Sequence, residues 1–144
     1  MKNELYAVLR DDRFWLIPGS NASESVEVSN QYHEEGYITE KEYQEINRIG
    51  DLYGDHHTGA TDHGQTRWTP DHMPPTQLGI RAQRFGLLAD MLDELNIPYA
   101  VTQRFYPHAK GSWQHQGKVT ARIGRATEKI ENNIKEEDDD GFYS

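Results

Sequence analysis

"LGIRAQRFGLLADMLDEL", residues 78–95, carries the clearest secondary-structure signal in the chain. Its apolar side chains recur every three to four residues, which is the spacing of one face of an α-helix. These side chains are Leu78, Ala82, Phe85, Leu88 or Ala89, Leu92 and Leu95. We expect one central amphipathic helix of about four to five turns, which ends before Pro98 and buries this face in the core.

The segments that follow this helix resemble two strands joined by a polar loop. Residues 98–106 and 118–123 are rich in β-branched and aromatic side chains, and residues 107–117 between them are polar. This pattern predicts a C-terminal β-hairpin whose loop carries His108 and His115.

The N-terminal part predicts a second hairpin followed by a helix. Residues 4–19 contain two β-rich runs, and the charged residues 10–13 between them supply a turn. Further along, Thr39 is followed three residues later by Glu42, the spacing of a capping box at a helix start. Gly50 is a plausible end for that helix.

Length and composition place these elements in one α+β domain. The chain has 144 residues, of which 35% are hydrophobic, which suits a single domain with a modest core. Residues 1–134 are expected to form this domain, with a short terminal helix over 125–136. Residues 135–144 are strongly acidic and predict a disordered tail.

Several classes of protein are disfavoured by what the sequence lacks. It contains no cysteine, so any metal site must use His, Asp or Glu ligands. It has neither an N-terminal apolar segment nor a run of 18 apolar residues, which argues against a secretory signal and a membrane span. We therefore expect a cytoplasmic protein with no membrane partner.

The charge is distributed unevenly along the chain. The formal net charge is −9, which by itself disfavours nucleic acid as a partner. However, no acidic residue occurs between Glu94 and Glu128. The basic residues in that stretch include the four that we predict to contact phosphate, namely Arg104, Lys110, Lys118 and Arg122. A solvated strand face is the alternative interpretation.

Residues 54–75 form an unusual polar segment. They read "GDHHTGATDHGQTRWTPDHMPP" and contain three Asp-His pairs and four of the seven histidines of the chain. Histidine is the commonest neutral metal ligand and the side chain best placed to move a proton near pH 7. With little apolar surface to bury, such a long loop would be ordered by a metal, a polar network or a ligand. A polar surface loop is the alternative.

The pair Asp71-His72 has the most restricted surroundings of the three. It stands within "WTPDHMPP" (68–75), where prolines stiffen both flanks and the central helix follows. Such a rigid unit could place a metal ligand beside a general base, as a one-metal nuclease requires. The pair His56-His57 is a second candidate, with His57 as a possible ligand, whereas Asp62-His63 is compatible with simple loop polarity.

The order "PDHMPP", helix, strand and "YPHAKGSWQHQG" resembles the Asp-His-x-Pro variants of the HNH, or His-Me finger, nucleases. These include nuclease domains of bacterial polymorphic toxins, and the resemblance covers residues 68–117. It implies that Asp71 is a metal ligand and His72 the general base. It also implies that His108 or His115 completes a site for Mg²⁺ or Zn²⁺. The asparagine of the family motif has no clear counterpart, because Asn96 lies at the end of the helix.

Trp113 lies at the tip of the predicted hairpin loop. An exposed tryptophan there could stack on a nucleic-acid base, whereas a buried one would pack on the core.

The favoured function is therefore that of a metal-dependent phosphodiesterase or nuclease acting on nucleic acid or a nucleotide. The alternative is a protein of phage or mobile-element type without enzyme activity. Such a protein would use its acidic ends to bind a basic host protein, or would hold a nucleotide without cleaving it.

Overall fold

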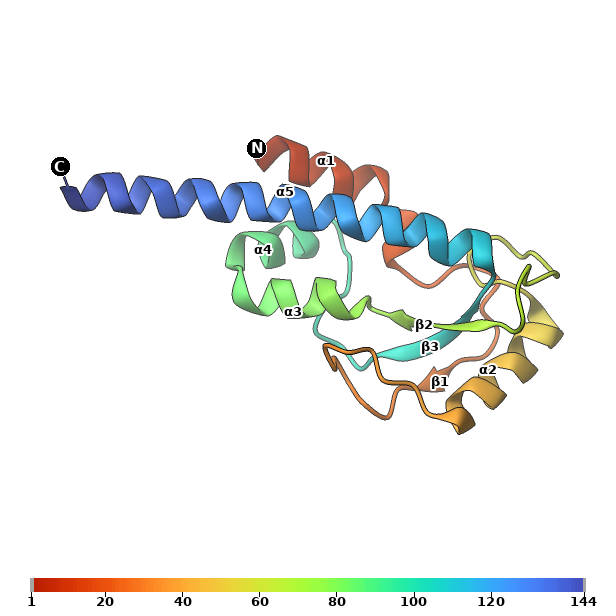
Figure 1. Cartoon of the computed structure of the whole chain (residues 1–144). Coiled ribbons are helices and arrows are strands. Elements are labelled where there is room, and N and C mark those ends of the chain that lie inside the picture. Colours follow the sequence, from red (N-terminus) through yellow and green to blue (C-terminus); the bar gives the residue numbers. More distant parts are fainter. Residues whose placement is uncertain (1, 144) are drawn as a thin grey trace.

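The computed structural model describes the backbone of residues 2–143 and the side chains of residues 2–134. It confirms the α+β class: helices surround one small antiparallel sheet (Figure 1). The elements are α1 (Lys2–Asp11), the 3₁₀ helix η1 (Arg13–Leu16), β1 (Val26–Glu27), α2 (Glu40–Tyr53), β2 (Thr69–Met73), α3 (Thr76–Arg84), α4 (Gly86–Glu94), β3 (Arg104–His108) and α5 (Lys110–Tyr143). In the described part of the chain, no helix has the length and apolar composition needed to cross a bilayer.

The sheet has the order β1-β3-β2, with both neighbours antiparallel to the central β3. Helix α2 lies on one side of it, and α5 runs across the other (Figure 1). Successive residues of a strand point to opposite faces of a sheet. On β2, His72 packs against Phe105 of the α2-side core, whereas Asp71 points to the α5 side and contacts Gln116 of that helix.

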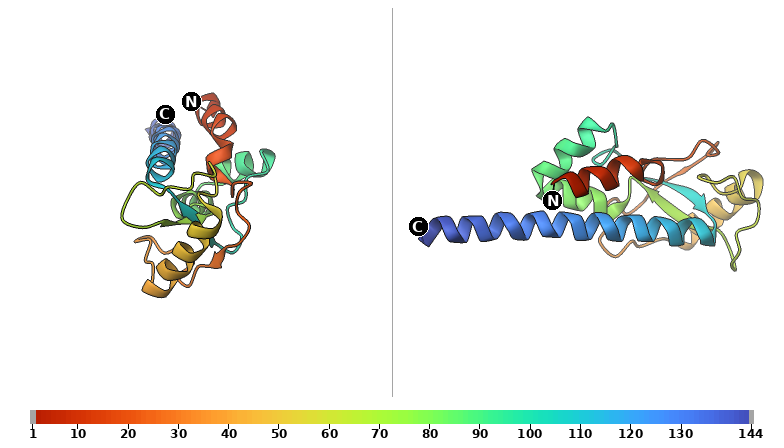
Figure 2. Two further views of the ribbon diagram at one scale, coloured as in Figure 1. Left: turned by 90° about the vertical axis from the view of Figure 1, so that its right-hand side faces the viewer. Right: turned by 90° about the horizontal axis from the view of Figure 1, so that it is seen from above.

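Two hydrophobic clusters hold the elements together. One joins α1, α3, α4 and α5, and α1 lies alongside α5 in both views of Figure 2. The other lies between α2 and the sheet, and Trp68 and Phe105 are its largest buried side chains. Burial of apolar surface is the main stabilising contribution in both.

The prediction of an N-terminal hairpin over residues 4–19 is wrong. The structure has α1 and η1 there instead. Leu5 and Leu9 are fully buried and lie one helical turn apart, so both reach the core that α1 forms with α5. The β-rich composition of this short segment concealed that spacing.

The predicted central helix, residues 78–95, is two helices that break at Phe85. Phe85 has φ −130° and ψ 98°, so its backbone is extended and it ends α3 just before α4 begins. Leu78 of α3 and Leu92 of α4 nevertheless belong to the same core. The periodicity was therefore correct for burial, but it did not reveal the break.

The prediction of a C-terminal hairpin is also wrong, because its second strand, residues 118–123, belongs to α5. Val119, Ile123 and Ile130 are buried at helical spacing against the α1-side core. The short run 118–123 alternates like a strand, and only a longer window shows the helical period. The predicted short helix 125–136 is likewise part of α5.

Two further predictions concern the long loop and the end of the chain. The polar loop predicted over 54–75 is shorter in the structure, because residues 69–73 form β2, and α2 continues past the predicted end at Gly50 to Tyr53. The tail, residues 135–144, lies where side chains are outside the described residues, so its disorder stays a prediction.

The predicted capping box at the start of α2 is confirmed. The Glu42 carboxylate accepts the backbone N–H groups of Thr39 (2.8 Å) and Ser29 (2.9 Å), while Thr39 Oγ1 accepts the Glu42 N–H. Burial alone would raise the pKa of Glu42, but these hydrogen bonds outweigh it and lower the pKa.

Glu42→Ala is expected to lower the free energy of unfolding by about 2 kcal/mol, because the two part-buried N–H groups of Thr39 and Ser29 lose their acceptor. Urea unfolding at neutral pH measures this. Because the carboxyl pKa is lowered in the fold, the difference from wild type should shrink as the pH falls and the carboxylate becomes protonated. Glu45 of the same helix is the control, because it is only partly buried and its carboxylate bonds Arg48 at the surface. An equal loss in Glu45→Ala would contradict the assignment.

Candidate metal centre

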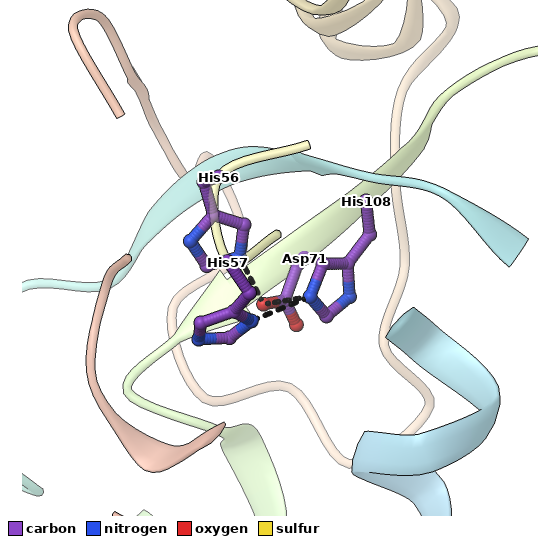
Figure 3. A group of neighbouring side chains, drawn as sticks. All are labelled: His56, His57, Asp71 and His108. Atoms are coloured by element: carbon purple, nitrogen blue, oxygen red, sulfur yellow. Dashed lines mark hydrogen bonds and ion pairs between the residues drawn. The ribbon is translucent and has the colours of Figure 1, made fainter. Parts of the chain in front are cut away.

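Three histidines and one aspartate gather beneath the start of α5. His56, His57, Asp71 and His108 are all buried, and their nearest ligand atoms lie within 4.8 Å of one another. They come from the loop after α2, from β2 and from the end of β3, and their polar ends point toward one another (Figure 3). Buried polar groups of this kind require partners, a shared proton or a cation.

A single carboxylate holds two of these segments together. Asp55 is fully buried, and its Oδ1 accepts the N–H groups of His57 and Thr58, each at 2.8 Å. Its Oδ2 accepts the N–H of Ala109 at 2.7 Å, at the junction of β3 and α5. Because His57 and Ala109 are held by one side chain, His57 is kept close to His108.

The Asp55 carboxylate remains ionised in this position. Burial alone would raise its pKa, but hydrogen bonds from the Ala109 and Thr58 N–H groups and from the Ser112 side chain outweigh burial and lower it. Asp55 is therefore a fixed buried charge that organises the site without facing its centre.

The hydrogen bonds of His56 fix its tautomer. Its Nδ1 accepts the backbone N–H of Gly19 at 3.0 Å, so the proton of the neutral ring lies on Nε2. That Nε2–H donates to Asp71 Oδ2 at 2.8 Å. A Cβ at residue 19 would overlap the His56 carbonyl oxygen, so glycine permits this close approach. His56 thus orients Asp71, and it would have to lose the Gly19 hydrogen bond to bind a cation through Nε2.

His57 presents a lone pair to the centre of the site. Its Nε2 lies 2.8 Å from the Ile17 carbonyl oxygen, which can only accept, so Nε2 carries the proton. Its Nδ1 is then unprotonated and lies 2.8 Å from His108 Nε2. The His108 Nε2 in turn lies 3.5 Å from Asp71 Oδ2.

The second ring nitrogen of His108, Nδ1, bears on whether the cluster can bind a cation. Among the described residues, His108 Nδ1 is buried and has no hydrogen-bond partner. Without an ion, the His108 proton lies on Nε2 and is donated to His57 Nδ1. A shift of that proton to the unpartnered Nδ1 would free Nε2. His57 Nδ1, His108 Nε2 and the Asp71 carboxylate would then form a cradle of two imidazoles and one carboxylate, which fits a divalent ion.

The titration of the cluster follows from its burial. Burial lowers the pKa of His56 to about 4 and also lowers the pKa values of His57 and His108. Burial raises the pKa of Asp71, an effect that the neighbouring His108 and His57 oppose. The histidines are therefore neutral at pH 7, the form in which imidazole binds a metal.

Acidification is expected to destabilise the metal-free protein. Below about pH 6.5 the unfolded chain takes up protons on its histidines, whereas the folded His56 does so only near pH 4. Stability should thus fall by a few kcal/mol between pH 6.5 and 4. Urea unfolding in EDTA at several pH values measures this. His56→Gln should have a shallower pH dependence, and the same slope as wild type would contradict the assignment.

Aromatic rings cover one side of the cluster. Trp15 of η1 lies 4.8 Å from the His57 ring and 4.5 Å from the His115 ring, measured between ring centroids. Phe14, also on η1, lies 5.1 Å from His57. These contacts restrict access to His57 from this side.

A groove of about 330 Å³ reaches the cluster from the other side. Asp71 and His72 line it together with Trp113 and Gln116. Gln116 Nε2 donates to Asp71 Oδ2 at 3.4 Å, so α5 contributes a contact to the same carboxylate. The groove is the route by which a substrate could approach Asp71.

The structure gathers some of the predicted site residues and separates others. His57, Asp71 and His108, three of the predicted metal ligands, lie together. His115 stacks on Trp15 outside this group, and His72 is not part of the group although it lines the adjoining groove.

The predicted base-stacking and phosphate-binding residues lie apart from the ligand group. Trp113 is 40% exposed, and its Nε1 donates to Gln65, so the side chain neither joins the core nor points freely into solvent. Lys110, Lys118 and Arg122 lie on α5, whereas the Arg104 guanidinium binds Ser25.

Sequence reasoning missed the roles of Asp55 and His56. Their signal was the string Asp55-His56-His57, the one place in the sequence with adjacent histidines. Their roles depend on Ala109 and Gly19, which are distant in sequence and could not be paired with them by spacing.

Comparison of the chain with protein-family models, with curated proteins and with solved structures finds no match.

Proposed function

We propose that the protein is a metal-dependent phosphodiesterase that hydrolyses nucleic acid. The observation that carries this proposal is the buried meeting of His57, His108 and Asp71 beside a groove that also contains His72. A divalent ion would be coordinated by all three side chains, which in its absence are held together mainly by hydrogen bonds. A catalytic site also requires a route for substrate, which the groove provides.

The ligand set bears on the choice of metal. Mg²⁺ binds oxygen ligands almost exclusively, whereas imidazole nitrogen suits Zn²⁺ and other first-row transition ions. Of the two ions expected from the sequence, Zn²⁺ fits two imidazoles and one carboxylate better. Held there, such an ion would supply positive charge that stabilises the phosphate oxygens during hydrolysis.

The other residues have distinct proposed roles. His72 is half-buried and lines the groove next to Asp71, and burial lowers its pKa, so its ring is neutral and able to accept a proton from water. His56 holds the Asp71 carboxylate in place through its Nε2–H.

His72→Ala is expected to reduce cleavage of DNA or RNA by about 100-fold or more, because the proposed base is lost. The assay compares wild type and variant on labelled single-stranded and double-stranded substrates, with EDTA or with added Zn²⁺, Mn²⁺ or Mg²⁺. Metal affinity should change far less than the rate, since His72 is outside the ligand group. His33→Ala, which removes an exposed histidine, is the control.

A wild-type protein that cleaves no nucleic acid with any of these ions would remove the proposal. Release of an intact bound nucleotide would instead favour the binding protein without enzyme activity, and binding of a basic protein would favour the inhibitor.

A further inference from the structure

One flank of α5 carries three cationic side chains, those of Lys118, Arg122 and Arg125, next to His115. His115, Lys118, Arg122 and Arg125 line a groove of about 430 Å³ along the helix, and all four are exposed. At 1.5 Å per residue, they extend over about 15 Å of the helix axis. No carboxylate is present on α5 before Glu128, although the chain as a whole has a net charge of −9.

Few acidic groups neutralise this row. Arg122 forms an ion pair with Asp12 at 3.1 Å, which fixes the position of its guanidinium. Within the described residues, Lys118 and Arg125 have no carboxylate at ion-pair distance. Asp62 lies in the adjoining groove rather than in this one. A positive surface therefore persists in an acidic protein.

Aromatic rings continue the cationic row toward the candidate metal centre. His115 lines both this groove and a second one that contains Trp15, so the two grooves adjoin. The Trp15 ring lies against His115 and against Phe14, whose centroid is 5.1 Å away. Phe14 is 49% exposed although it is a large apolar side chain. Exposed aromatic rings beside a row of cations are typical of surfaces that bind unpaired nucleotides.

We infer that this surface, defined by Phe14, Trp15, His115, Lys118, Arg122 and Arg125, binds single-stranded nucleic acid. The cations contact successive phosphates, and the aromatic side chains stack on bases. Stacking requires bases that are not already paired, so the surface selects single strands over duplexes. The inference rests on the proposed function in taking nucleic acid as the ligand, and it adds the strandedness of that ligand.

Fluorescence anisotropy in EDTA tests this without cleavage. The probes are fluorescein-labelled DNA and RNA strands of about 15 nucleotides and the duplex of the same DNA sequence. Wild type should bind the single strands more tightly than the duplex. The triple variant K118A/R122A/R125A should lose about 10-fold or more in affinity, and the slope of log K against log salt should decrease by about 2.

Matched variants separate a local effect from a general change of charge. R48A/R67A/R84A removes the same number of charges from other exposed positions and should bind like wild type. Phe14→Ala should weaken single-strand binding without changing the salt slope, whereas Tyr37→Ala removes an exposed aromatic elsewhere and should have no effect. Circular dichroism checks that each variant is folded.

Equal affinity of the α5 triple variant and its matched control would overturn the inference, and so would duplex binding as tight as single-strand binding. The proposed function fails separately, if divalent ions give no cleavage. Selective single-strand binding in EDTA would then still support the inference.

Discussion

The Asp71→Asn substitution is expected to abolish tight binding of a divalent ion while preserving the fold. Asparagine has nearly the shape of aspartate and can still accept the His56 Nε2–H, but it carries no charge. Because the ligand set has one anionic member, its loss should weaken metal affinity by about 100-fold or more. Competition with a chromophoric chelator for Zn²⁺ measures the affinity, and metal-dependent cleavage should be lost in parallel.

The variants of the neighbouring histidines should follow a defined order. His57→Ala and His108→Ala each remove a ligand and should be about as severe as Asp71→Asn. His56→Asn removes only the group that orients Asp71, so its expected loss is smaller, at about 10-fold to 100-fold. A loss for His56→Asn equal to that of the ligand variants would show that His56 itself binds the ion.

Stability provides a second measurement of the same substitution. Asp71 is a buried carboxylate whose pKa burial raises, so neutral asparagine should not destabilise the metal-free protein strongly. Added Zn²⁺ should raise the melting temperature of wild type but not that of Asp71→Asn. A comparable rise in both proteins would place the ion elsewhere.

Local signals in the sequence were sufficient where the structure depends on neighbouring residues. The capping box of Thr39 and Glu42 is formed within one helical turn, and its spacing alone predicted the start of α2. By contrast, the hairpin predicted over residues 4–19 rested on β-rich composition in a short segment. That segment is helical because Leu5 and Leu9 pack against elements far along the chain.

In the candidate site, too, some features could be predicted from nearby residues, whereas others depend on residues far apart in the sequence. The polar segment 54–75 was identified from its residue types, and the resemblance to the HNH nucleases implied His108 or His115 as a further ligand. The structure brings His108 together with members of that segment in one cluster. The individual role of each residue in the cluster could not be predicted from the sequence. It depends on which nitrogen of each histidine is protonated, and for His56 the Gly19 N–H determines this from 37 residues away.

Asp55→Ala is expected to cause the largest loss of stability of any single substitution considered. The change removes a fully buried carboxylate that accepts three backbone N–H groups, those of His57, Thr58 and Ala109. Buried donors that lose their acceptor cost about 1–3 kcal/mol each. We therefore expect a loss of about 3–5 kcal/mol, a large part of the stability of a typical domain. Urea unfolding in EDTA measures this without a contribution from metal.

Asp55→Asn separates the hydrogen bonds from the charge. One asparagine oxygen can still accept part of the set, so the expected loss is intermediate between wild type and Asp55→Ala. Asp62→Ala is the matched control, because Asp62 is exposed and bonds only a neighbouring N–H in its own loop. Because Asp55 joins the His56-His57 loop to the start of α5, metal affinity should fall along with stability. Unchanged stability in Asp55→Ala would mean that packing, rather than this carboxylate, holds the two halves of the candidate site together.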